Sequence, residues 1–540
     1  TSDTRPALRV VGADEQAPTT DRFGRPMIHV RKGELPRMCE QAIAALTTAP
    51  DLYTREGSLV HVAHATAEEA APAIQAGAPR IYPVTPPGLT ERLSHVAAWQ
   101  RSDRPDDPPP MVVGAVLARR VWPALRPLAG IVQAPTLRPD GSLITAAGYD
   151  PSTAMLYAPS ETWPEQPDEP SHDDARQALA DLLDAFVDFP WETTAGPSCA
   201  VAALLTVLAR PAVLGAVPAF VFDANSPASG KTLVADTIAT IATGREAGRH
   251  SYPQDPKGSD AEISKALTAY AMAGTQIVCF DNLSPDNVFG GPAIESVLTA
   301  RDTASFRILG KSEVVTLPWR TVVLATGNNV EVSRDCERRA LVPRFLARWE
   351  TADARPLSSF QHQDRAGRLV QWARSQRGHL VTCALVLLRA YHLAGRPSQG
   401  LRWASFEEWT ELVPSAIVWA GGASPLAARP AESGRVSPER AALMVVLRDW
   451  PRLDPEGNGV TIKAVLALLY PELRHGEQQP PDGFDELRGA LEDLAPIRNG
   501  RTPDPVRLSG AFRRTRQVAI SGRAIEAGEK ARTWRVAVVT

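Results

Sequence analysis

A Gly-Lys-Thr run behind an apolar segment carries the strongest chemical signal in this 540-residue sequence. Residues 223–232 are DANSPASGKT, and their last three letters match the end of the pattern GxxxxGK[ST]. In such a loop, backbone N–H groups and a helix N-terminus hold phosphates, the lysine reaches the outer phosphate oxygens, and the hydroxyl ligates Mg²⁺. The pattern predicts a site for ATP and Mg²⁺ formed by Ser229, Gly230, Lys231, Thr232 and Leu233.

The pattern departs from its usual form at Asn225, which stands in place of the first glycine. Asparagine tolerates the left-handed backbone better than most residues, so we expect the loop to survive with Asn225 in the binding site. A GKT run alone is weak evidence. An apolar strand at Ala219–Phe222 and a helix starting near Leu233 strengthen it, because the chemistry needs the loop between these two elements.

An acidic residue ends a second apolar strand, Gln276–Asp281. At the C-terminal edge of a parallel sheet, Asp281 would hold Mg²⁺ together with Thr232. A buried strand with a capping aspartate is the commoner explanation of such a segment on its own. The next residue, Asn282, cannot act as a base, so the group that polarises the attacking water stays open between Asp281 and Glu262.

A third strand, Thr321–Ala325, precedes the residues Thr-Gly-Asn-Asn. An amide here would contact the γ-phosphate, with Asn328 the first choice and Asn329 the second. Paired asparagines are more often a turn. The order of loop, acidic strand and amide strand favours a single nucleotide site.

Arginines concentrate just beyond the third strand, at Arg338, Arg339 and Arg344. Charge runs are usually solvated surfaces. In a ring-shaped ATPase, however, a guanidinium from the neighbouring subunit completes the site. We expect Arg338 and Arg339 to be catalytic, although the finger stays open between these two and Arg344, and such a finger predicts oligomerisation.

Around these motifs the chain divides into segments of different pattern. We expect a flexible tail at 1–34, an α+β domain at 35–158, a linker at 159–174, an α/β core with a parallel sheet at 175–350, a helical region at 351–430 and a winged helix at 436–540. Expected elements include helices at Met38–Leu46 and Leu89–Trp99, and a β-hairpin of Val518–Ile520 with Trp534–Val539.

The motifs together resemble the superfamily 3-like AAA+ helicases and primase-helicases of phages, plasmids and integrative elements. The likeness rests on GKT, IVCFDN, FRILGKSE, ATGNN and DCERR, and extends to APTLRPDG, GYD, FEEWT and WAGG, covering most of residues 35–425. It implies a P-loop AAA+ ring, a hexamer by the resemblance, that hydrolyses ATP, translocates on single-stranded DNA and works with primase or other replication proteins.

Two segments offer DNA contacts. Residues 307–317 predict a hairpin around Gly310 with Arg307 and Lys311 free for phosphates, although an exposed hairpin with incidental charges fits equally well. Residues 498–540 contain ten basic and three acidic residues, a local DNA footprint that a protein-docking module could also show. The candidate contacts there are Arg513, Arg514, Arg516, Lys530 and Arg532.

Composition argues against several other classes of protein and site. No apolar run approaches a membrane span, and the five scattered cysteines form neither CxxC pairs nor Cys/His clusters, which argues against disulfide frameworks and zinc sites and fits a reducing cytoplasm. The leading hypothesis is an ATP-dependent DNA helicase of a mobile element. The alternatives are a replication initiator or helicase loader that binds duplex DNA without unwinding it, and a non-hydrolysing nucleotide-binding scaffold.

Overall fold

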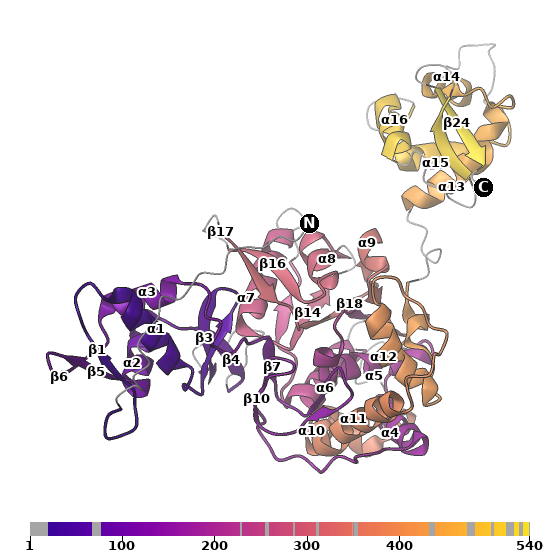
Figure 1. Cartoon of the computed structure of the whole chain (residues 1–540). Coiled ribbons are helices and arrows are strands. Elements are labelled where there is room, and N and C mark those ends of the chain that lie inside the picture. Colours follow the sequence, from indigo (N-terminus) through magenta and orange to yellow (C-terminus); the bar gives the residue numbers. More distant parts are fainter. Residues whose placement is uncertain are drawn as a thin grey trace. The chain divides into compact units, whose positions relative to one another are not determined.

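The computed structural model divides the chain into two compact units, Thr1–Pro430 and Ala431–Thr540. It describes residues 20–66, 77–226, 229–253, 259–284, 287–308, 313–347, 349, 355–430, 438–471, 481–497, 502–514, 523–528 and 533–538. The first unit is a mixed α/β structure with a parallel central sheet, as the sequence predicted (Figure 1).

Five parallel strands form the central sheet in the order β13-β14-β18-β12-β20, and β21 also pairs with β12. The bounds are β12 Ala219–Ala224, β13 Arg249–Ser251, β14 Ile277–Leu283, β18 Val322–Asn328, β20 Ala340–Leu341 and β21 Arg344–Phe345. The carboxyl ends of β12, β14 and β18 therefore meet at one edge, where parallel sheets bind ligands.

The side chains of β12 alternate between the two faces of this sheet, and both faces are buried. Phe220 and Phe222 enter the core shared with α5 (Ala195–Leu208) and α6 (Lys231–Thr243), whereas Val221 enters the core shared with α7 (Ser259–Ala273) and α8 (Pro292–Leu298). Successive side chains of a strand point to opposite faces, so a continuously apolar strand needs helices on both sides.

The segment before the core packs three helices against short strands, which lie at the indigo end of Figure 1. They are α1 Leu35–Leu46, α2 Pro86–Val96 and α3 Pro110–Ala118, with β1 Met27–His29, β2 Leu52–Arg55, β3 Ser58–His64, β4 Pro79–Pro83, β5 Ala98–Arg101 and β6 Arg104–Asp106. The helix predicted over Leu89–Trp99 is wrong at its end. Ala97 is extended (φ −140°, ψ 150°), and Trp99 continues as a strand paired with Ile28.

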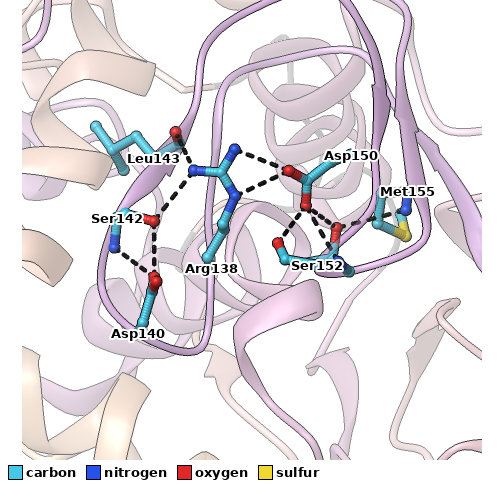
Figure 2. A network of polar contacts seen from close by, with 8 residues as sticks. Arg138, Asp140, Ser142, Leu143, Asp150, Ser152 and Met155 are labelled. Carbon is cyan, nitrogen blue, oxygen red and sulfur yellow. Dashed lines mark hydrogen bonds and ion pairs between the residues drawn. The ribbon is translucent and has the colours of Figure 1, made fainter.

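An arginine–carboxylate network links two short hairpins ahead of the core (Figure 2). The hairpins are β8 Thr136–Leu137 with β9 Leu143–Ile144, and β10 Gly148–Asp150 with β11 Met155–Tyr157; β11 also pairs with β7, Gly130–Val132. Arg138 donates to Asp150 Oδ1 at 2.8 and 3.0 Å and to the Leu143 carbonyl at 2.7 Å. Ser152 donates to the other oxygen of Asp150 at 2.7 Å.

This network sets the charge state of Asp150. Burial would raise the pKa of the carboxyl group, but the hydrogen bonds from Arg138, Thr153 and Ser152 outweigh burial and hold the pKa well below its usual range. The segments APTLRPDG (134–141) and GYD (148–150), which six residues separate, are thus bonded to each other through Arg138 and Asp150.

Further helices join the core on the side of the sheet that α5 and α6 cover. They are α4 His172–Asp184, α10 Leu369–Ser375, α11 Arg377–Leu393 and α12 Glu407–Trp419; the short α9 is Arg334–Glu337. Within residues 351–430, where the sequence predicted a helical region, the described elements include α10, α11 and α12. Every helix among the described residues is too short or too polar to cross a bilayer.

The second unit surrounds an antiparallel sheet of order β22-β24-β23 with helices. The elements are α13 Pro438–Leu453, β22 Val460–Thr461, α14 Ile462–Leu469, α15 Asp485–Leu494, α16 Pro505–Arg514, β23 Arg523–Ala527 and β24 Thr533–Val538. The first strand of the expected hairpin is Arg523–Ala527, and the predicted piece Val518–Ile520 lies outside the described residues.

Candidate functional site

Lys231 is a buried cation at the start of α6, with only 8% of its surface exposed. Its ammonium donates to Asn328 Oδ1 at 2.7 Å, Ser229 Oγ at 3.1 Å and the Ser226 carbonyl at 3.3 Å. All three acceptors are neutral oxygens. Burial lowers the pKa of Lys231, while the fields of Asp223 and Asp281 oppose this shift. The result is a desolvated positive charge that no contacting carboxylate neutralises among the described residues.

Gly230 turns the chain into α6 with a left-handed backbone (φ +96°). A Cβ on this residue would lie 3.1 Å from the Phe189 ring, so the turn favours glycine by conformation and by space. No side chain caps the helix, and its first N–H groups face the loop beside Lys231. An uncapped helix N-terminus next to a buried ammonium suits an anion.

Asn225 acts differently from the sequence-based expectation. It is absent from the described residues with positive φ, so a tolerance for the left-handed region is not what it contributes. Its side-chain amide instead makes two bonds to Ala347, donating to the carbonyl at 3.0 Å and accepting from the N–H at 2.9 Å. Asn225 therefore ties the start of the loop to the chain that follows β21.

Asp281 meets two hydroxyl groups at the end of β14. Thr232 Oγ1 donates to Asp281 Oδ1 at 3.2 Å, and Thr326 Oγ1 from β18 donates to the same oxygen. Thr326 was not predicted as a site residue. The available signal was its position two residues before Asn328, on the strand β18 that neighbours the strand of Asp281. The pair of Thr232 and Asp281 offers a hydroxyl and a carboxylate, which are ligands that Mg²⁺ prefers.

A bulge follows Asp281. The register passes from Phe280↔Ala325 to Leu283↔Gly327, so β14 holds one residue more than β18 at this point. Asn282 occupies the bulge with φ +61° and an exposed side chain. Glu262, the other candidate base, pairs with Lys265 on the surface of α7 at 2.5 Å.

The two asparagines after β18 have separate contacts. Asn328 accepts from Lys231, whereas Asn329 accepts from an Arg344 Nη at 2.9 Å. Arg344 also lies 3.4 Å from Asp223, a carboxylate only 2% exposed that further accepts from the Val330 N–H at 2.9 Å. Asp223 was missed from the sequence because its partners lie more than 100 residues away. Arg344 is thus committed to its own chain.

Arg338 and Arg339 lie at the opposite edge of the sheet. They precede β20, whose Ala340 pairs with Ala219 at the start of β12, while the Lys231 loop follows Ala224 at its end. These ends are roughly 16 Å apart at ~3.3 Å per residue. Arg339 faces Glu295 at 3.9 Å, and the Arg338 side chain is exposed. Neither is brought to the Lys231 site of the same chain.

The proposed DNA contacts are only partly within the described residues. The predicted hairpin is confirmed as β16 (Thr303–Ile308) paired antiparallel with β17 (Glu313–Pro318), and Arg307 is exposed on it. Arg513 is exposed on the last turn of α16. Lys311, Arg516, Lys530, Arg532 and the side chain of Arg514 lie outside the described residues.

Comparisons with known proteins add a limited picture. No protein-family model and no curated protein matches the chain. Among solved structures, the C-terminal region of NrS-1 is 12% identical over 92% of this chain and 98% of that chain, with a TM-score of 0.34. JCV helicase is 12% identical over 42% of this chain and 74% of that chain, with a TM-score of 0.18. Neither likeness, at these TM-scores, defines the fold or the function of this chain.

Proposed function

We propose that this chain is an ATP-dependent DNA helicase or translocase that forms an AAA+ ring, with its ATPase site at the C-terminal edge of the parallel sheet. The observation that carries the proposal is Lys231. Among the described residues the Lys231 ammonium donates to neutral oxygens, and a buried charge costs stability unless it is paired or serves a ligand. An ATP phosphate is the natural counter-charge beside an uncapped helix N-terminus.

The surrounding side chains fit Mg²⁺ and a triphosphate. Thr232 and Asp281 already lie within 3.2 Å of each other, and the Thr326 hydroxyl orients the same carboxylate, so these residues would hold the ion. Mg²⁺ would supply charge neutralisation at the phosphates. Lys231 would bind the outer phosphate oxygens, and the amide of Asn328, which touches Lys231, would report whether the terminal phosphate is present.

The positions of Arg338 and Arg339 support the proposed ring. Since Arg338 and Arg339 are at the far edge of the sheet from Lys231, their catalytic use requires the site of a neighbouring subunit. We propose a homo-oligomer, a hexamer by the family resemblance, in which the β16–β17 hairpin with Arg307 and a winged-helix second unit with Arg513 contact DNA. Replication of a mobile element is the setting that the resemblance suggests.

The test is ATP hydrolysis with and without single-stranded DNA, in the wild type, Lys231→Ala and the control Lys265→Ala. Removing one preorganised electrostatic contact typically costs about 10²–10³-fold in turnover. We expect that loss in Lys231→Ala alone, together with DNA stimulation of the wild type and strand separation in an unwinding assay.

Other outcomes separate the alternatives. Hydrolysis with duplex-DNA binding but no unwinding would favour an initiator or helicase loader. ATP binding without turnover in the wild type would favour a scaffold, and equal turnover in Lys231→Ala would refute the site.

A further inference from the structure

Asp181, His379 and Cys383 bring three metal-ligating side chains together on the packed helices α4 and α11. Among the residues that the structure describes, they form the one trio of this kind whose ligand atoms all lie within 4.8 Å of one another. His379 and Cys383 are one helical turn apart, and Asp181 reaches them from 198 residues earlier in the chain. The sequence predicted no zinc site because it shows no Cys/His cluster, and this trio forms only when α4 and α11 come together.

The three ligand atoms have the spacing of one face of a coordination tetrahedron. His379 Nε2 lies 3.0 Å from Asp181 Oδ2 and 3.6 Å from Cys383 Sγ, and the sulfur lies 3.8 Å from the same carboxylate oxygen. Zinc bonds of roughly 2.0–2.3 Å place tetrahedral ligands about 3.3–3.6 Å apart. Cys383 Sγ also lies 3.9 Å from His379 Nδ1, so the imidazole of His379 must turn for Nε2 to bind an ion that the sulfur and the carboxylate also bind. The His379 side chain is 54% exposed, which leaves room for that rotation.

The environment of the trio also suits an ion. Gln177 donates to the other carboxylate oxygen of Asp181 at 2.8 Å and so orients the group, as outer partners of metal ligands do. Cys383 is 6% exposed, whereas the side chains of His379 and Asp181 are 54% and 31% exposed. Protein thus surrounds the sulfur, and solvent can reach the fourth coordination position.

We propose that Asp181, His379 and Cys383 bind a zinc-class divalent cation that joins α4 to α11, with water as the fourth ligand. Sulfur and imidazole select zinc over the Mg²⁺ expected at Thr232 and Asp281, because hard cations prefer oxygen ligands. The ion stabilises the contact between α4, which comes before the strands of the parallel sheet, and α11, which comes after them. This site does not depend on the proposed ATPase function.

A hydrogen-bonded His379–Asp181 pair beside a buried thiol is the competing explanation, and cobalt distinguishes the two. The full chain is stripped with a chelator, dialysed and titrated with Co²⁺, whose bond to a thiolate gives a near-ultraviolet charge-transfer band. We expect a band that saturates at one equivalent, disappears on addition of Zn²⁺ and is absent in Cys383→Ser.

Two further variants make the test specific. His379→Ala changes an exposed side chain, so the fold should persist while Co²⁺ affinity falls at least about tenfold. Cys39→Ser removes another buried cysteine, on α1, and should keep the band. Zn²⁺ should raise the unfolding temperature of the wild type and Cys39→Ser but not of Cys383→Ser. Absence of a saturable band in the wild type, or its survival in Cys383→Ser, would overturn the proposal.

Discussion

Arg338→Ala is expected to stop ATP turnover without weakening the fold. The Arg338 side chain is exposed, so its removal should change the free energy of unfolding by less than about 0.5 kcal/mol. If Arg338 completes the site of the next subunit, turnover should fall by about 10³-fold or more, the effect of losing an arginine finger.

Mixing two inactive variants tests whether Arg338 acts across an interface. Lys231→Ala keeps the arginine, and Arg338→Ala keeps the phosphate loop. In a randomly assembled ring of equal parts, an intact site needs one chain of each kind in the correct order, so about one quarter of the interfaces should be active. The assay is steady-state hydrolysis of the mixture against each variant alone, after subunit exchange.

Arg344→Ala supplies the matched control, because Arg344 contacts Asp223 and Asn329 of its own chain. Mixed with Lys231→Ala, it should restore nothing, since each chain then carries a defect in its own site. Full turnover by Arg338→Ala alone would refute the assignment, as would a mixture that assembles but stays inactive.

Two further predictions concern the backbone of the loop and the network in Figure 2. Gly230→Ala should lower the free energy of unfolding by about 1–2 kcal/mol and weaken ATP binding, because residue 230 has a left-handed backbone with φ of +96°. Urea titration measures the stability and a binding isotherm the affinity for ATP. Unchanged values of both would contradict this prediction. Asp150→Asn should cost about 3 kcal/mol at pH 7, because it breaks the pair with Arg138. Since the pKa of Asp150 is depressed in the folded protein, this stabilisation is complete above about pH 3.9 and is lost as pH falls through the lower folded pKa. The free energies of unfolding of the wild type and Asp150→Asn, measured by urea titration, should therefore converge in acid. A difference that does not change with pH would refute the ionic origin.

The meeting of Lys231, Thr232, Asp281 and Asn328 follows from reasoning on the sequence, because parallel strands bring their carboxyl ends to one edge. Each residue was predicted to lie at or just beyond the carboxyl end of an apolar strand, and the pairing of these strands in one sheet brings the residues together. The ends of helices were harder to predict from the sequence. The segment Leu89–Trp99 has helical apolar spacing, but pairing of Trp99 with Ile28 overrides that local preference.

Contacts between distant segments were not predictable from one sequence. Asp223 looked like part of the phosphate loop, and its role in holding Arg344 appears only when β21 lies beside β12. Cys383 and His379 had the right spacing on a helix, yet the carboxylate that completes the trio belongs to α4. Asn225 was recognised as a departure, but its bonds to Ala347 depend on where the chain returns after β21.

The bulge at Asn282 restricts how this site could evolve. A glutamate at that position would adopt a left-handed backbone, which asparagine tolerates better than a longer side chain. Replacing Asn282 by glutamate therefore carries a conformational penalty that aspartate, which tolerates this backbone as asparagine does, would largely avoid. Deleting the extra residue between Phe280 and Leu283 would remove the bulge and with it the preference for these two residue types.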